Sequence, residues 1–369
     1  MSGAAQRPWP LVVRRARPGD EAQVLSFATN TWNGWDYMPR AWPRWLEAED
    51  GVLLVGAVGG AGGPDVDGQP LDPGQVVAIV RVAMPARGEA WWEGIRVDPR
   101  VRAMDVATDL QVAEFAWSAA NGARIVRYAT SARNEGSHRL GARGGLVPIA
   151  EFLHAEWKLT HEQGSDEHES RRSGFDPEVQ AHARQRRHDL LDQLAREGLV
   201  PDQSMAERIW RGVWGDDAFN AGARLYEPRP WALEELTHDK FLDHLRLGEV
   251  LHGEDADGGK AVAIIVADVP AAENPELDLA LTVGTPRATF ELVERIRRHA
   301  NAHLNFRYPA SGALIDDFRQ QYLDAGWELS DWELHILGRP IDEAHPVPEV
   351  DPTAVVLEET PRAVITPPR

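Results

Sequence analysis

The chain repeats one series of segments, with the second copy about 185 residues after the first. The apolar run QVVAIVRVAM at 75–84 corresponds to KAVAIIVADV at 260–269, and both runs follow a Gly-rich turn. Matching segments then continue in the same order, ending with LGARGGL at 140–146 in the first copy and YLDAGW at 322–327 in the second. A period of this length is too long for a solenoid repeat, so it predicts two copies of one domain.

Composition places the boundaries between these copies. The segment 161–175 is polar and charged, as linkers often are, and 176–197 has the pattern of a linking helix. We therefore expect a first domain at 1–160, a linker and linking helix at 161–199, a second domain at 200–341 and a tail at 342–369. The tail has six prolines in 28 residues, so it is either disordered or extended across another surface.

Periodicity predicts alternating strands and helices in each copy. Apolar residues at Val106, Leu110, Ala113 and Trp117 have helical spacing and indicate a helix over 105–120. In the first copy we expect strands near 11–17, 51–58, 75–84, 91–97, 125–130 and 150–159, with a short helix at 137–143. In the second copy we expect helix from about 200 to 247, and from 248 onward the same order of elements as in the first.

Charge and composition limit the possible partners. The net charge of −19 disfavours nucleic acid and anionic membrane, because phosphate binding needs clustered Lys and Arg. It favours a cationic small molecule such as an amine, although solubility alone would also explain it. Cysteine is absent, the N-terminus has no signal-like apolar segment, and no apolar run is long enough to span a bilayer. We expect a cytoplasmic protein.

The most specific motif follows the predicted strand at 91–97. The sequence VDPRVRAMDVATDL, with Val97, Pro99, Arg102, Asp105 and Ala107, resembles the acetyl-CoA loop of the GNAT superfamily of N-acetyltransferases. The element order from 11 to 159 is also similar to that fold, and the second copy resembles a degenerate version. The resemblance implies an α/β (α+β) fold with two such domains, each a mixed, mostly antiparallel central sheet flanked by helices.

The beginning of a helix suits a pyrophosphate, because its first N–H groups lack intrahelical acceptors and carry partial positive charge. The resemblance assigns cofactor binding to Ile95, Val97, Arg102, Ala103, Asp105, Ala107, Thr108 and Asn134. Asp105 replaces the family's first glycine, and its carboxylate would repel a pyrophosphate unless it points outward. An ordinary helix capped by aspartate is the alternative at this position, and Asn134 is equally suited to cap the short helix after it.

The second copy lacks this loop, because only GTPRATF separates Val283 from the next helical pattern. We expect only the first copy to bind acetyl-CoA. The resemblance also implies two catalytic groups: Glu93 as the general base and, for the general acid, a tyrosine whose position in the first copy is taken by Gly141. A solvated strand residue without a catalytic role is the alternative for Glu93. The second copy has Tyr322 at that position, where core packing is the alternative role.

The aromatic segment at 32–45 lies where the family builds its acceptor wall. Trp32, Trp35 and Tyr37 are candidate substrate-binding residues, because aromatic faces attract ammonium groups. Ordinary core packing would also explain such a cluster. The histidines show no ligand spacing, so the sequence predicts no metal site.

Together these features predict an acetyl-CoA-dependent N-acetyltransferase with a small cationic or aromatic primary amine as acceptor, and they are compatible with a homodimer. The alternative is a non-catalytic protein of the same fold that binds CoA or another ligand without turnover.

Overall fold

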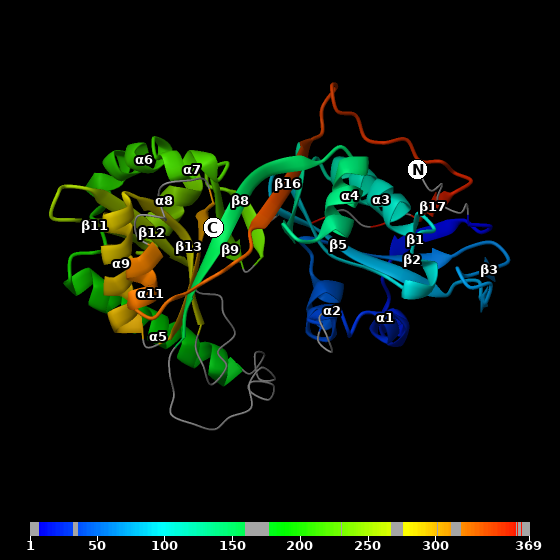
Figure 1. Ribbon diagram of the computed structural model, residues 1–369, viewed down its shortest axis with the longest axis horizontal. Coiled ribbons are helices and arrows are strands. Elements are labelled where there is room, and N and C mark those ends of the chain that lie inside the picture. The colour runs from blue at the N-terminus through cyan, green and yellow to red at the C-terminus, as the bar shows by residue number, and fades with distance from the viewer. Residues whose placement is uncertain are drawn as a thin grey trace. The chain divides into compact units, whose positions relative to one another are not determined.

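The computed structural model describes residues 7–31, 36–158, 177–229, 231–266, 276–300, 302–310, 319–358, 360 and 363, with the backbone alone at 177–184, 186–187 and 276. The chain forms two compact units (Figure 1). The first unit consists of Met1–Thr130, Asn134–Pro148 and Leu337–Arg369, and the second of Ser131–Arg133 and Ile149–Ile336.

Two strands pass from one unit to the other. Strand β8 (Val147–Trp157) begins in the first unit and continues in the second, while β16 (Leu334–Pro340) begins in the second and ends in the first. Each unit therefore contains strand residues from the opposite half of the chain.

The first unit is built on a mixed, mostly antiparallel sheet with the strand order β7-β6-β5-β2-β1-β17. Its strands are β1 (Leu11–Arg15), β2 (Gly51–Val58), β5 (Val76–Ala86), β6 (Glu89–Val97), β7 (Ile125–Ser131) and β17 (Val355–Leu357). Only the β6–β7 and β1–β17 pairs among these described strands are parallel. The loop after β2 carries the two short strands β3 (Gly63–Pro64) and β4 (Pro70–Leu71).

Helices cover both faces of this sheet (Figure 1). Helices α1 (Glu21–Phe27) and α2 (Met38–Glu47) enclose one core with β2 and β5, and α3 (Val106–Ala120) packs on the opposite face, near α4 (Glu135–Arg143). The four residues of α3 with helical spacing (Val106, Leu110, Ala113 and Trp117) are all buried, so that prediction is confirmed.

The tail over 342–358 contains bends at 342–345, a turn at 352–354 and a short strand at 355–357. It packs Val347, Val350 and Ala354 against the core on the α3 face and then forms β17 beside β1. The part of the tail that the structure describes up to 358 therefore packs on the first unit.

The second unit has the strand order β11-β12-β13-β14-β8, again mostly antiparallel with one parallel pair, β13–β14. Its strands are β11 (Val250–Glu254), β12 (Lys260–Val266), β13 (Glu276–Gly284) and β14 (His303–Pro309), with β15 (Glu328–Leu329) also beside β8. One face packs on α5 (Pro177–Arg196), α9 (Pro286–Ala300) and α11 (Arg319–Asp324), and the other on α6 (Ala206–Trp214), α7 (Asp217–Ala221) and α8 (His238–Arg246). The expected fold class is confirmed in both units.

Two details of the second copy concern the sequence predictions. Helix α9 begins at Pro286, two residues after β13 ends at Gly284, so the second copy does lack the long connection that precedes α3. The expectation of helix throughout 200–247 is wrong, because β9 (Leu225–Arg229) and β10 (Ala232–Glu235) form a two-stranded sheet there. Among the described residues, no helix is long and apolar enough to cross a membrane.

Candidate functional site

Strand β6 carries a bulge near its C-terminal end. Its pairing with β5 passes from Glu93↔Arg81 to Arg96↔Ile79, so two residues of β6 lie opposite one residue of β5. Gly94 is one of these two residues and has a φ of 71°. A bulge of this kind bends the strand and redirects the backbone groups that follow it.

The bulge is held against an aromatic residue of α2. A Cβ at Gly94 would lie 2.6 Å from the ring of Trp45, and Trp45 contacts Tyr37 edge-on with 5.8 Å between ring centroids. Glycine is required here both by the positive φ and by the close approach of the indole.

Strand β6 separates from β7 shortly before the bulge. The parallel pairing covers three residue pairs and ends at Trp91↔Arg127, whereas β6 continues to Val97 and β7 to Ser131. Ile95 and Val97, two predicted cofactor-binding residues, lie on this diverging part of β6 and are half-buried. The facing edges of the two strands therefore leave backbone N–H and C=O groups free for a ligand that enters between them.

The segment 98–105, here called the α3 entry loop, leads from this opening to the beginning of α3. Ala103 and Asp105 both have left-handed backbone conformations, with φ values of 62° and 56°. The first helical hydrogen bond joins the N–H of Asp109 to the carbonyl of Asp105, 3.0 Å apart. Helix geometry leaves the preceding N–H groups, including those of Ala107 and Thr108, without intrahelical acceptors.

The side chain of Asp105 is neutralised by a neighbour. Arg143, in the last turn of α4, places Nη1 3.2 Å from Oδ1 of Asp105 and 3.3 Å from Oγ1 of Thr108. Asp105 does not cap the helix with its side chain. Arg102 is exposed and makes no ion pair with any residue that the structure describes, so its charge is available at the beginning of α3.

A second aspartate in the first turn of α3 is also paired. The guanidinium of Arg7 makes an ion pair with Asp109 and donates a hydrogen bond to the carbonyl of Met104, at 3.1 Å. Burial raises the pKa of Asp109, Arg7 opposes this shift, and the nearby carboxylates of Asp105 and Asp351 add to it. Each of the two α3 aspartates thus has an arginine partner.

The predicted base Glu93 lies on β6 immediately before the bulge. Its carboxylate makes an ion pair with the buried Arg81, whose other terminal nitrogen lies 2.5 Å from Oδ1 of Asp50. The side chain of Glu93 is about one-fifth exposed, which leaves it accessible from one side.

The predicted aromatic wall is described in part. Tyr37 lies under the guanidinium of Arg96, 5.0 Å from ring centroid to Cζ, and burial raises the pKa of Tyr37. Arg96 in turn binds both carboxylate oxygens of the buried Asp36, at 2.8 and 3.1 Å. Trp32 and Trp35 lie outside the described residues.

Helix α4 contributes two further observations. Asn134 caps it, with Oδ1 accepting a hydrogen bond from the N–H of Ser137 at 3.1 Å. A Cβ at Gly141 would lie 2.3 Å from the hydroxyl oxygen of Tyr128 and 2.8 Å from a methyl carbon of Leu337. The space beside Gly141 in the first unit is therefore filled by a tyrosine from β7.

Tyr128 has a buried acidic neighbour that the sequence reading missed. Glu114 of α3 is 2% exposed, and burial raises its pKa well above the usual range. The pKa of Tyr128 is raised by burial, and the nearby Glu114 adds to the shift. Glu114 lies among the apolar core positions of α3. This position in the helical pattern is the sequence signal that could have indicated a buried carboxyl group.

The predicted acid Tyr322 belongs to the second unit. Its ring packs against Phe290, Phe306 and Trp327, with centroid distances of 4.8 to 5.8 Å. Tyr322 is 6% exposed, and burial raises its pKa. Its surroundings within the second unit are those of a core residue.

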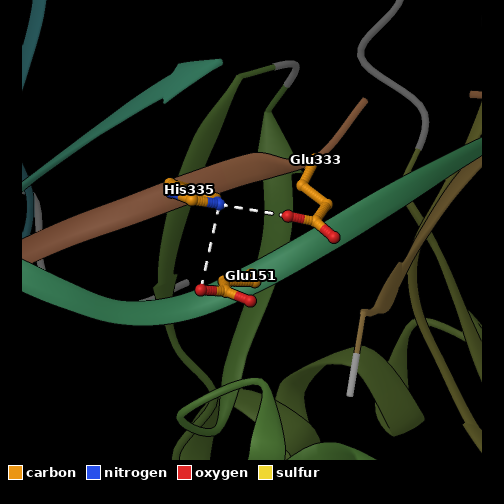
Figure 2. Close-up of side chains that lie close together, drawn as sticks. All are labelled: Glu151, Glu333 and His335. Carbon is orange, nitrogen blue, oxygen red and sulfur yellow. Dashed lines mark hydrogen bonds and ion pairs between the residues drawn. The ribbon is translucent and has the colours of Figure 1, made fainter. Parts of the chain in front are cut away.

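The second unit also brings together three side chains that the sequence reading did not connect. Glu151 of β8, Glu333 immediately before β16 and His335 of β16 point toward one another (Figure 2). Their ligand atoms all lie within 4.8 Å of one another, which is the arrangement that could hold a metal ion.

Comparisons with known proteins give likeness in structure alone. No protein-family model matches the sequence, and no curated protein matches it. A GCN5-related N-acetyltransferase from Sphaerobacter thermophilus is similar over 89% of this chain and 95% of its own, with 15% identity and a TM-score of 0.47. One from Kribbella flavida is similar over 91% of this chain and 72% of its own, with 15% identity and a TM-score of 0.41. A tandem GNAT protein from the clavulanic acid biosynthesis pathway is similar over 89% of this chain and 98% of its own, with 12% identity and a TM-score of 0.39.

Proposed function

We propose that the first unit binds acetyl-CoA between the diverging ends of β6 and β7 and transfers its acetyl group to a primary amine. The observation that carries this proposal is the position of the opening. The β6–β7 pairing ends at Trp91↔Arg127, and the same β6 leads through the α3 entry loop to the beginning of a helix. A long ligand with an anionic end fits such a combination, because the strand edges and the helix N-terminus offer N–H donors in succession.

The pyrophosphate group would be held at the beginning of α3. The left-handed conformations at Ala103 and Asp105 turn the chain closely into the helix, and the N–H groups of Ala107 and Thr108 are left to donate. Arg102 supplies a positive charge without an ion-pair partner among the described residues. The residues present therefore fit a pyrophosphate.

Bound acetyl-CoA would supply the acetyl group as an activated thioester. The backbone N–H groups of β6 after the bulge, from Ile95 to Val97, donate to ligand oxygens, including the acyl oxygen as it gains negative charge. Because the bulge is fixed by Gly94 and Trp45, these donors are positioned before the ligand arrives.

The acceptor amine must lose a proton before it attacks. Glu93 receives this proton at its carboxylate, directly or through water, and its pairing with Arg81 keeps the side chain in place. The partly buried Tyr37, which packs edge-on against the buried Trp45, is the described member of the predicted aromatic wall, and aromatic faces favour a cationic or aromatic amine.

Ligand binding without turnover is the second candidate. Gly141 cannot donate a side-chain proton, and the adjacent space is occupied by Tyr128, whose hydroxyl donates to the carbonyl of Ser137 at 2.8 Å. Tyr322 is part of the core of the second unit. These observations favour a protein in which proton delivery to a leaving thiolate is slow or absent.

The deciding experiment measures binding and turnover separately. Thermal unfolding with and without acetyl-CoA should show stabilisation of about 2.7 kcal/mol at 100 times the dissociation constant. Arg102→Ala should weaken this effect, while Arg139→Ala, which changes an exposed arginine paired with Glu135 on α4, should not.

Turnover is then followed as release of free CoA thiol with a panel of polyamines and arylamines. Thiol release that depends on both amine and Glu93 supports acyl transfer. Binding without release supports the second candidate. The absence of any shift at millimolar acetyl-CoA rules out acyl transfer from acetyl-CoA, and it rules out the second candidate with acetyl-CoA as its ligand.

A further inference from the structure

We propose that Glu151, Glu333 and His335, here called the His–Glu cluster, form a binding site for a divalent transition-metal ion, with zinc as the best fit. The site lies within the second unit and is independent of the acyl-transfer proposal for the first unit. It supplies two carboxylates and one imidazole, a mixed set that suits zinc and other first-row divalent metals.

The backbone holds all three residues in place. Glu333 and His335 are two positions apart in an extended segment, so their side chains project to the same side. The carbonyl of Glu333 accepts a hydrogen bond from the N–H of Ala132, and that of Glu151 accepts one from Ala310, both at 2.8 Å. Glu151 comes from β8, so two separate chain segments present ligands to one point (Figure 2).

The distances within the cluster fit ligands around a metal ion. Nε2 of His335 lies 3.3 Å from Oε2 of Glu333 and 3.8 Å from Oε1 of Glu151. Two atoms that are each about 2.0–2.1 Å from a tetrahedral zinc ion lie about 3.3–3.4 Å apart. Strong N–H···O contacts are shorter, at about 2.7–3.2 Å. Small side-chain rotations would bring all three atoms to ligand distance.

The negative charges of the Glu151 and Glu333 carboxylates also favour a bound cation. Among the residues that the structure describes, no Lys or Arg makes an ion pair with Glu151 or Glu333. His335 is the basic group at ion-pair distance from both, and Arg133 and Arg319 line the same groove as Glu333 without pairing with it. Nearby on the same sheet, by contrast, Glu156 and Glu328 share Lys158. With a neutral imidazole the two carboxylates carry −2, which a divalent cation balances.

The cluster is accessible to ions. The side chains of Glu151 and Glu333 are about half exposed, while that of His335 is 16% exposed. Glu333 also lines an open groove with Arg133, Asp331 and Leu153. Three protein ligands would leave one tetrahedral position for water.

The test is calorimetric titration of zinc chloride into the full-length chain after dialysis against a chelator. The expected result is one site that His335→Ala and Glu333→Gln each weaken by more than about tenfold. Because a chain of net charge −19 also binds divalent ions diffusely, Glu328→Gln is the matched control. It removes one charge from the same unit outside the cluster and should leave zinc affinity unchanged.

Binding of Co²⁺ tests metal coordination directly, because a cluster with a purely structural role would not produce the visible absorption of a bound cobalt ion. Visible absorption of bound Co²⁺ should appear with the wild-type chain and disappear in His335→Ala. Equal zinc affinity in the wild type and both cluster variants would overturn the proposal, as would loss of affinity in Glu328→Gln to the same extent. Circular dichroism identifies any variant that fails to fold, in which case Glu151→Gln replaces it. None of these measurements involves acetyl-CoA, so the metal-site proposal can fail while the proposed acyl transfer stands.

Discussion

Nη1 of Arg143 lies 3.2 Å from Oδ1 of Asp105, across the gap between the last turn of α4 and the beginning of α3. The sequence raises Asp105 as an obstacle to pyrophosphate binding, because a carboxylate there repels phosphate. In the structure the carboxylate is paired, and Arg143 also reaches Thr108 in the first turn of α3. The pair converts a repulsive position into a nearly neutral one.

Removing Arg143 should therefore weaken acetyl-CoA binding. Arg143→Ala leaves Asp105 unpaired, and one unit charge at about 4 Å in a water-exposed setting contributes roughly 1 kcal/mol. We expect the dissociation constant to rise about fivefold. Asp105→Gly should act in the opposite direction, because it frees Arg143 for phosphate and keeps the left-handed φ of 56° without strain.

Isothermal titration calorimetry with acetyl-CoA measures the dissociation constants of Arg143→Ala and Asp105→Gly. Arg139→Ala is the control for the loss of an exposed arginine on the same helix. If both variants bind acetyl-CoA like the wild type, the pyrophosphate does not lie near this pair.

A second prediction concerns the filled space beside Gly141. Gly141→Ala should destabilise the first unit by about 1–3 kcal/mol, because the new methyl group would lie 2.3 Å from the Tyr128 hydroxyl. Gly136→Ala in the same helix is the matched control, since its nearest neighbour would be Asn134 Oδ1 at 3.6 Å. Urea unfolding compares the two, and Tyr128→Phe should restore part of the loss. Equal stability of the two alanine variants would show that Tyr128 moves aside without cost.

The sequence predicts the local elements of this fold well, because they depend on neighbours in the chain. The spacing of Val106, Leu110, Ala113 and Trp117 identifies α3, and the short connection before Pro286 shows that the second copy lacks the loop. The pair β9–β10 is missed because its strands are only five and four residues long, too short for a clear alternation.

Relationships between distant residues could not be predicted in this way. An apolar strand such as β8 does not reveal which strand it pairs with, and β14 is about 150 residues away in sequence. The Asp105–Arg143 pair and the His–Glu cluster likewise join residues whose proximity depends on tertiary packing. The sequence could supply the residue types of these sites but not their partners.

The bulge on β6 offers a third test. Gly94→Ala combines two costs, since φ is 71° and the methyl group would meet the Trp45 ring at 2.6 Å. Gly74→Ala isolates the first cost, with a φ of 80° and nothing within 4 Å of the new atom. An alanine in a left-handed conformation costs about 1–2 kcal/mol, and both variants bear this cost. Because only Gly94→Ala also clashes with Trp45, it should lower the free energy of unfolding by roughly 1–3 kcal/mol more than Gly74→Ala does.

Chemical unfolding followed by tryptophan fluorescence measures both variants. Because the bulge positions the donors on β6, Gly94→Ala should also weaken acetyl-CoA binding, whereas Gly74→Ala should not. Equal destabilisation would mean that Trp45 does not confine this glycine.

The fourth prediction follows from His154, on β8 in the second unit. Burial, together with the positive charge of Arg307, lowers the pKa of His154 to about 4, although a hydrogen bond with Asn305 opposes the shift. The folded pKa lies below the unfolded value of about 6.5, so the unfolded chain binds the proton more tightly between these values. Stability is therefore retained above about pH 6.5 and should fall by up to roughly 1.4 kcal/mol for each pH unit between 6.5 and 4. Urea midpoints of the wild type and His154→Gln at pH 7 and pH 5 measure the effect. The variant should lose less stability than the wild type over this range, because glutamine does not titrate, and parallel losses would show that His154 is not held neutral by the fold.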